Sequence, residues 1–178
     1  IEVKSIQGEG TTFLVRLDLK LVEEETEADQ TLLAVEAGEE KEKDPGFLKG
    51  RRIMLVEDNE LNREIAYELL SESGLIVDVA ENGQEAIKLL GTRPENYYEL
   101  IFMDIQMPVM NGYEATANIR AGESDYWKTI PVIAMTANVF QEDESRAAEC
   151  GMSDYVTKPI DMNVIYSVLE KWLRGQKG

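Results

Sequence analysis

Short apolar runs alternate with helical patterns from residue 49 of this chain onward. The apolar runs occupy residues 52–56, 76–79, 100–103, 131–135 and 154–156. Between them, and after the last, apolar residues recur at helical spacing, as in Leu61, Ile65 and Leu69. Strands that alternate with helices are joined by crossovers, which place them in one parallel sheet with helices on both faces. The sequence therefore predicts a doubly wound α/β fold, with a five-stranded parallel sheet flanked by five helices.

Polar residues stand at the carboxyl ends of four of these runs. They are Glu57 and Asp58 after the first run, Asp104 after the third, Thr136 after the fourth and Lys158 shortly after the fifth. In a doubly wound parallel sheet, ligands bind in the crevice at the carboxyl ends of the strands. We therefore expect these side chains, which are far apart in sequence, to meet in one crevice.

The residue types at these strand ends indicate a particular chemistry. Three crowded carboxylates repel one another unless a cation neutralises them. The chain has no His and a single Cys, so hard oxygen ligands remain, and these favour Mg²⁺. An ammonium and a hydroxyl group nearby suit the oxygens of a phosphoryl group, and a carboxylate can itself act as the nucleophile. The predicted chemistry is Mg²⁺-assisted phosphorylation of an aspartate.

The acidic composition excludes several classes of function. The chain has 18 Lys and Arg against 35 Asp and Glu residues, a formal net charge of −17, so nucleic-acid phosphates would repel it. Without His, the chain cannot itself form phosphohistidine. One Cys cannot close an intramolecular disulfide, which fits a reducing compartment such as the cytoplasm. No apolar run approaches the roughly 20 residues that span a bilayer, so we expect no membrane contact by this fragment.

The first 48 residues differ from the rest. Residues 1–22 alternate in polarity around a Gly-containing turn and predict a β-hairpin. Residues 23–48 predict a linker, because 23–46 hold ten acidic residues against two lysines and little apolar surface. The chain begins at Ile1, and we expect it to be a piece of a longer protein.

Four motifs in the remaining part carry a family resemblance. In order, they are Glu57-Asp58, Asp104-Ile105-Gln106-Met107-Pro108, Met135-Thr136-Ala137 and Tyr155-Val156-Thr157-Lys158-Pro159. Together they strongly resemble the receiver domain of two-component response regulators, over residues 49–174. The resemblance implies a flavodoxin-like fold with strand order 2-1-3-4-5. It also raises the expectation of a cis peptide bond before Pro159.

The resemblance implies a role for each acid at the site. Asp104 would be the phosphoacceptor and would take its phosphoryl group from phosphohistidine. Mg²⁺ would be held by Asp58, Asp104 and the main-chain carbonyl of Gln106, and Glu57 would act through a water molecule.

Residues on the fourth and fifth strands would respond to the phosphoryl group. Lys158 would bond to it, Thr136 would move towards it, and Tyr155 would follow Thr136 inward as an aromatic switch. The resemblance further implies that access to the acyl phosphate and the rate of its hydrolysis depend on Ala137, Gln106 and Asn138.

A second, shorter resemblance lies in the first segment. Residues 5–13, Ser-Ile-Gln-Gly-Glu-Gly-Thr-Thr-Phe, resemble the last glycine box and closing strands of a histidine-kinase ATP-binding domain. With the receiver motifs behind it, the whole looks like the carboxyl-terminal part of a hybrid sensor histidine kinase. The fragment itself would have no kinase activity. The full-length parent kinase could be anchored in a membrane. Its expected partners are a histidine kinase, a His-containing phosphotransfer protein or the kinase domains of its own parent.

Simpler interpretations exist for individual residues. Glu57 and Asp58 alone are equally compatible with capping the next helix. Asn59 and Asn62 are interpreted as caps and surface polar groups. The pairs Tyr97-Tyr98 and Tyr126-Trp127 are interpreted as partly exposed loop aromatics.

Two other functions compete with the phosphoacceptor switch. One is an Asp-nucleophile phosphohydrolase, which needs a second acid two residues after the nucleophile, where this chain has Gln106. The other is a degenerate receiver that acts as a non-catalytic interaction module. The complete set of acids, Thr and Lys argues against the second of these.

Overall fold

The computed structural model describes residues 2–6, 10–14, 45–137 and 146–174. The chain divides into two compact units, residues 1–43 and 44–178. In the first unit, strand β1 (Glu2–Ile6) pairs antiparallel with β2 (Gly10–Leu14). This confirms the expected amino-terminal hairpin, whereas the expected continuation of its second strand and the acidic linker up to residue 44 lie outside the described residues.

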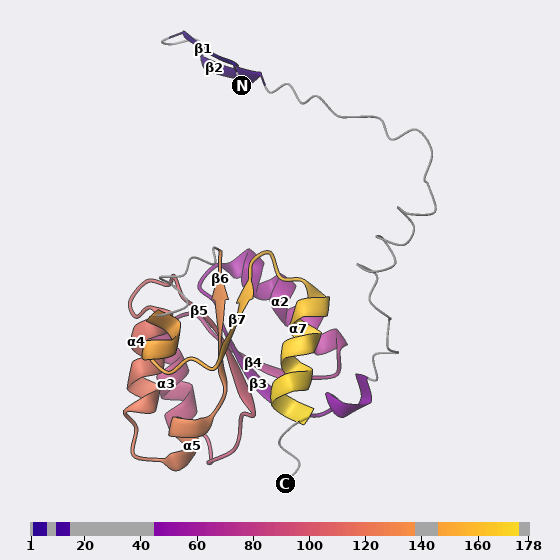
Figure 1. The fold of residues 1–178 in the computed structure, drawn as a ribbon, viewed down its shortest axis with the longest axis vertical. Helices are drawn as coiled ribbons and strands as arrows, with labels where there is room; N and C mark the ends of the chain where they lie inside the picture. Colours follow the sequence, from indigo (N-terminus) through magenta and orange to yellow (C-terminus); the bar gives the residue numbers. More distant parts are fainter. Residues whose placement is uncertain (1, 7–9, 15–44, 138–145, 175–178) are drawn as a thin grey trace, which may run out of the picture. The chain divides into compact units, whose positions relative to one another are not determined.

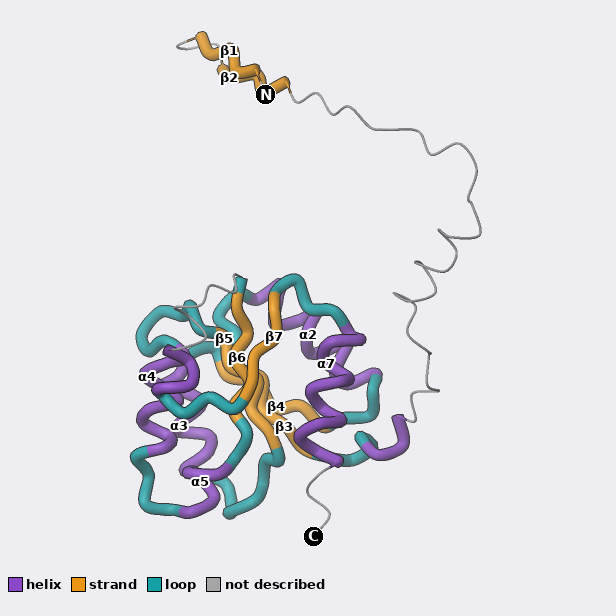
Figure 2. Tube along the Cα trace, in the orientation of Figure 1, coloured by secondary structure: helices purple, strands orange, loops and turns teal. Residues whose placement is uncertain are grey.

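The second unit is built on a parallel sheet (Figures 1 and 2). Its strands are β3 (Arg52–Val56), β4 (Ile76–Ala80), β5 (Leu100–Asp104), β6 (Val132–Thr136) and β7 (Asp154–Thr157). They are arranged as β4-β3-β5-β6-β7, and every neighbouring pair is parallel. This is the expected order 2-1-3-4-5, and the fold class is confirmed.

Helices cover both faces of this sheet (Figure 1). One face carries α2 (Glu60–Glu72) and α7 (Met162–Leu169), which continues into the π-helical turn η2 (Glu170–Arg174). The other face carries α3 (Gly83–Thr92), α4 (Gly112–Arg120) and the short α5 (Asp125–Thr129). Residues 146–149 form a further helical turn, and residues 138–145 of the fourth expected helix lie outside the described part. Within the described residues, no helix has the length and apolarity that crossing a membrane requires.

The central strands are apolar throughout because helices cover both faces of the sheet. Along β3, Ile53 and Leu55 pack into the core under α2 and α7, and Met54 and Val56 pack into the core under α3 and α4. Successive side chains of a strand point to opposite faces, so a strand covered on both sides cannot alternate in polarity. Burial of each such side chain stabilises the fold by about 1.5–3 kcal/mol.

Asparagine starts the helices that frame the carboxyl edge of the sheet. The side chains of Asn59, Asn82 and Asn111 each accept a hydrogen bond from a main-chain N–H in the first turn of α2, α3 and α4. Each cap satisfies one of the four N–H groups that a helix start leaves unpaired. The expected capping role of Asn59 is thus confirmed. These caps fix where each helix begins relative to the strand that precedes it.

Two leucines near the ends of the second unit are part of its core. Leu48 and Leu173 are both fully buried in the cluster under α2 and α7. Beside them, Phe47 in the short 3₁₀ turn η1 (Pro45–Phe47) packs edge-on against Tyr166, with ring centroids 5.6 Å apart. The guanidinium of Arg174 lies 4.8 Å from the centre of the Phe47 ring. Residues before β3 and after α7 therefore close one end of the domain together.

The interpretation of two aromatic pairs as exposed loop residues is wrong in part. Tyr98 is 1% exposed and Tyr126 is 9% exposed. The Tyr126 hydroxyl accepts a hydrogen bond from the Tyr98 N–H at 3.0 Å and donates one to the Tyr98 carbonyl at 2.9 Å. Tyr126 and Trp127 also belong to helix α5, which was not expected. The Tyr126 hydroxyl thus pairs both main-chain polar groups of Tyr98, as buried polar groups require.

Candidate functional site

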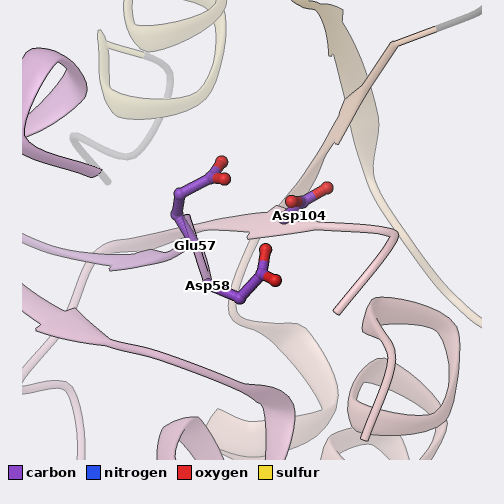
Figure 3. A group of neighbouring side chains, drawn as sticks. All are labelled: Glu57, Asp58 and Asp104. Carbon is purple, nitrogen blue, oxygen red and sulfur yellow. The ribbon is translucent and has the colours of Figure 1, made fainter. Parts of the chain in front are cut away.

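Three carboxylates meet at the carboxyl edge of the sheet. Glu57 and Asp58 directly follow β3, and Asp104 is the last residue of the neighbouring strand β5 (Figure 3). Carboxylate oxygens of the three residues lie within 4.8 Å of one another. Glu57 is 1% exposed and Asp104 is 5% exposed, whereas Asp58 is open to solvent. The expected convergence of these acids is present in the structure.

Lys158 brings the fourth charged group to the same place from the loop after β7. Its ammonium donates to Glu57 Oε2 at 2.6 Å and to Asp104 Oδ2 at 2.7 Å. The loop is held by a hydrogen bond from the Lys158 N–H to the Thr136 carbonyl at 2.7 Å. The peptide bond between Lys158 and Pro159 is cis, as expected. Residues from three strands thus contribute to one ion-pair network.

Burial and charge have opposite effects on the titration of this network. Burial raises the pKa of the Asp104 carboxyl above its ordinary value, against the lowering influence of its hydrogen bond to Lys158. Burial alone would lower the pKa of the Lys158 ammonium, but its hydrogen bonds to Asp104 and Glu57 outweigh this and raise the pKa. The single ammonium therefore does not fully offset the cost of burying the Asp104 carboxylate.

The carboxylates line an open cleft of about 400 Å³. Gln106, Thr136 and Ala137 also line it, and the Gln106 N–H donates to Asp104 Oδ1 at 3.2 Å. Tyr155 lies on β7 with 41% of its surface exposed and is not among the lining residues. Asn138 lies outside the described residues. The cleft thus brings together the expected acids, hydroxyl and ammonium.

Two further residues of α2 contact the acidic turn, and the sequence interpretation missed both. Asn62, taken there for a cap or surface residue, lines the cleft and donates from Nδ2 to Glu57 Oε1 at 3.2 Å. Arg63 donates from Nη1 to the carbonyls of Glu57 and Asp58, at 3.0 and 3.2 Å. Their position, one helical turn after the acids, was the sequence signal that could have indicated this contact.

Comparison with known families identifies this arrangement. The family model described as the response regulator receiver domain matches residues 53–170 of this chain. The chain belongs to this family. The resemblance of its four motifs to receiver domains is thereby confirmed, and the cleft of this receiver domain lies where the fold places ligands, at the carboxyl ends of its parallel strands.

Curated relatives of the receiver domain are histidine kinases. Hybrid signal transduction histidine kinase L of Dictyostelium discoideum is 35% identical over 143 residues, which cover 80% of this chain and 8% of that protein. Histidine kinase 3 of Arabidopsis thaliana is 37% identical over 147 residues, which cover 72% of this chain and 14% of that protein. The chain therefore corresponds to a small part of the length of these relatives.

Two solved structures are similar to the receiver domain in both sequence and fold. The receiver domain of a sensor histidine kinase from Pseudomonas aeruginosa PAO1, with a magnesium ion in its active site cleft, is 35% identical with a TM-score of 0.63. The alignment covers 70% of this chain and 98% of that chain. The receiver domain of Ssk1 from Saccharomyces cerevisiae, solved with the histidine phosphotransfer protein Ypd1, is 30% identical with a TM-score of 0.64. That alignment covers 72% of this chain and 92% of the other.

The donor set in the receiver domain's cleft fits a hard divalent cation. Glu57, Asp58 and Asp104 offer carboxylate oxygens within one small volume, against the single ammonium of Lys158. Oxygen donors with an open, solvent-accessible side are typical of Mg²⁺ sites, where the ion keeps several water molecules. The uncompensated negative charge and the raised pKa of Asp104 point to the same requirement for positive charge.

Proposed function

We propose that this receiver domain accepts a phosphoryl group on Asp104 in a His-to-Asp phosphorelay. The observation that carries the proposal is the place of Asp104, a buried carboxylate 2.7 Å from the Lys158 ammonium and next to two other acids. A carboxylate oxygen of Asp104 forms the new bond to phosphorus, while the bond between phosphorus and the donor's imidazole nitrogen breaks. The product is an acyl phosphate, and the donor histidine is released.

The residues around Asp104 divide the remaining work. Asp58, Asp104, the Gln106 carbonyl and, through water, Glu57 would hold Mg²⁺, which would supply the positive charge that lets an anionic carboxylate approach an anionic phosphoryl group. Lys158 moves its hydrogen bond from Asp104 to the phosphoryl oxygens, and the Thr136 hydroxyl donates to them.

Phosphorylation shifts the population between two states of the surface formed by the residues that follow β6 and β7. The phosphoryl group shifts the equilibrium because it binds better to the state with Thr136 turned inward. Tyr155, half exposed on β7, follows Thr136 as the switch residue. The residues that set access and lifetime of the acyl phosphate are Ala137, Gln106 and Asn138.

The rest of the chain fits a hybrid histidine kinase. We assign residues 1–22 to the end of an ATP-binding domain, 23–44 to an acidic linker and 45–174 to the receiver domain. The receiver starts earlier than the expected residue 49, because Leu48 is buried in its core and Phe47 packs against Tyr166. The relatives are themselves histidine kinases, which supports this assignment. The fragment is then a self-phosphorylating receiver without kinase activity, located in the cytoplasm, whose phosphodonor is a histidine kinase, a phosphotransfer protein or the parent's own kinase domains.

Phosphorylation by a small donor tests the proposal directly. The protein incubated with acetyl phosphate and Mg²⁺ should gain the mass of one phosphoryl group, on the peptide that contains Asp104. Removal of Mg²⁺ with EDTA should abolish this gain, because the crowded carboxylates then repel the donor. A domain that binds Mg²⁺ and yet takes no phosphoryl group would instead favour the degenerate receiver, the second candidate function.

The proposed protein donor has a suitable docking surface on α2. Leu61 and Ile65 are 65% and 48% exposed on this helix. Its N-cap Asn59 and its first-turn residue Asn62 line the cleft. Exposed apolar side chains beside a reaction site are typical of a protein contact. We expect Ile65→Lys to slow phosphotransfer from a histidine phosphotransfer protein about 10-fold, equivalent to roughly 1.4 kcal/mol.

Two controls separate docking from chemistry. Labelling of Ile65→Lys by acetyl phosphate should equal that of the wild type, because this small donor needs no protein surface. Ile76→Lys changes an isoleucine that is 39% exposed at the amino end of β4, at the sheet edge away from the cleft, and should leave both rates unchanged. Equal transfer rates for the two lysine variants would show that α2 is not the docking surface.

A further inference from the structure

Glu57 is an acid whose side chain is held on both oxygens. Its carboxylate is 1% exposed; Lys158 donates to Oε2 at 2.6 Å and Asn62 donates to Oε1 at 3.2 Å. The terminal torsion of a Glu side chain is broad and roughly two-fold, so sterics alone do not fix the plane of the carboxylate. Two hydrogen bonds, one on each oxygen, do fix that plane.

We propose that Asn62 is a positioning residue, whose amide holds the Glu57 carboxylate in the orientation that the metal site requires. This inference rests on the proposed function, in which Glu57 contributes to a Mg²⁺ site through water. Asn62 does not touch the reacting groups; it acts through Glu57. Groups that orient metal ligands from behind commonly change metal affinity about 10–100-fold when removed.

The main chain of the acidic turn is already fixed by another residue. Arg63 is largely buried and donates to the carbonyls of both Glu57 and Asp58, while its second nitrogen lies 3.3 Å from Glu81. With the main chain held, the freedom that remains to Glu57 is in its side-chain torsions. Asn62 acts on the last of these torsions, because its contact is with a carboxylate oxygen.

Lys158 cannot do this task alone. Its ammonium is shared between Glu57 and Asp104 in this structure, and in the proposed function it also binds the phosphoryl group. When Lys158 turns towards that group, Asn62 is the described donor that still holds Glu57. The amide is neutral, so it orients the carboxylate without cancelling the negative charge that a cation needs.

The position of Asn62 in its helix supports a role outside the cap. In α3 and α4 the third residue is a glutamate, Glu85 or Glu114, whose carboxylate reaches back to a main-chain N–H at the helix start. In α2 the third residue is Asn62, and its amide bonds Glu57 instead. A glutamate in that place would bring a further carboxylate against Glu57. Asn62 thus stands where the other two helices have a capping glutamate, and its amide provides a donor to Glu57.

Isothermal titration of the domain with Mg²⁺ alone tests this role. Asn62→Ala should raise the Kd for Mg²⁺ about 10-fold. The matched control is Asn118→Ala, because Asn118 is an exposed asparagine on α4 whose amide bonds the Glu114 carbonyl of its own helix. This control should bind Mg²⁺ as the wild type does. Thermal unfolding without Mg²⁺ should show similar midpoints for the two variants.

A double-mutant cycle distinguishes positioning from general damage. If Asn62 acts through Glu57, then Asn62→Ala added to Glu57→Ala, which removes the acceptor, should leave the Mg²⁺ affinity of Glu57→Ala unchanged. Additive losses in the cycle, or wild-type affinity in Asn62→Ala, would overturn the positioning role while the wild type still accepts a phosphoryl group from acetyl phosphate. A wild-type domain that binds no Mg²⁺ would overturn the proposed function and this inference together.

Discussion

Asp104→Asn is expected to abolish phosphorylation by both acetyl phosphate and a phosphohistidine donor. The amide has the shape of the carboxylate but no anionic oxygen, so it cannot form the bond to phosphorus. The measurement is the intact mass of the protein after incubation with acetyl phosphate and Mg²⁺. Asp125→Asn, a change at a fully exposed acid on α5, should be labelled as the wild type is. Phosphoryl transfer to the Asp104→Asn protein itself would refute the assignment.

The same variant should not be less stable than the wild type without Mg²⁺. Burial raises the pKa of Asp104, so the wild-type fold gives up stability as the pH rises through that pKa and the buried carboxylate ionises. Asparagine has no such ionisation. In EDTA, the variant should therefore unfold at a higher temperature than the wild type at pH 7, and this difference in midpoint should be smaller at pH 4. A variant that unfolds well before the wild type at pH 7 would show that the Lys158 ion pair outweighs the burial cost.

Gly112→Ala should have the largest effect on stability. A Cβ atom at this position would lie 2.2 Å from the Asp104 carbonyl oxygen and 3.0 Å from the Ile105 Cα. Both are main-chain atoms, and they cannot turn aside as a flexible side chain would. The Gly112 N–H also bonds the Ile105 carbonyl at 3.0 Å, which folds the loop back onto the end of β5. We expect a loss of about 3 kcal/mol in the free energy of unfolding.

Urea unfolding measures this loss, and a second glycine provides the control. Gly91, inside α3, would place its Cβ 3.7 Å from Trp127, which is ordinary contact. Gly91→Ala should stabilise the domain by about 0.5–1 kcal/mol, because alanine is the better helix former. The strand that must move in Gly112→Ala ends with Asp104, so acetyl phosphate labelling should also fall. Wild-type stability of Gly112→Ala would mean that the loop after β5 can shift freely.

The strands could be predicted because their signals are local. The run 52–56 is apolar throughout and ends at two acids, and β3 has the same bounds. Helix α5 could not be predicted, because five residues are too few to show a helical period. The burial of Tyr98 depends on Tyr126, 28 residues away, and no local pattern reports such a contact. The elements that show a period over several residues were therefore predicted, and the contact between two residues far apart in sequence was missed.

The site shows the same division. Glu57, Asp104 and Lys158 were predicted to meet because parallel strands bring their carboxyl ends to one edge. Asn62 and Arg63 were missed because their contacts depend on the direction in which α2 leaves the acidic turn. That direction follows from the Asn59 cap and the packing of α2 on the sheet. A sequence pattern gives the helix, but its orientation comes from the tertiary fold.

The buried pair Leu48 and Leu173 affects how this module can be exchanged between proteins. Both lie outside residues 53–170, the span matched by the family model. A fusion joined at those limits would leave a hole where two leucines had filled the space beneath α2 and α7, at about 2–5 kcal/mol for each large side chain lost. A transplantable unit therefore has its junctions ahead of Pro45 and beyond Arg174, so that the transferred domain keeps both buried leucines.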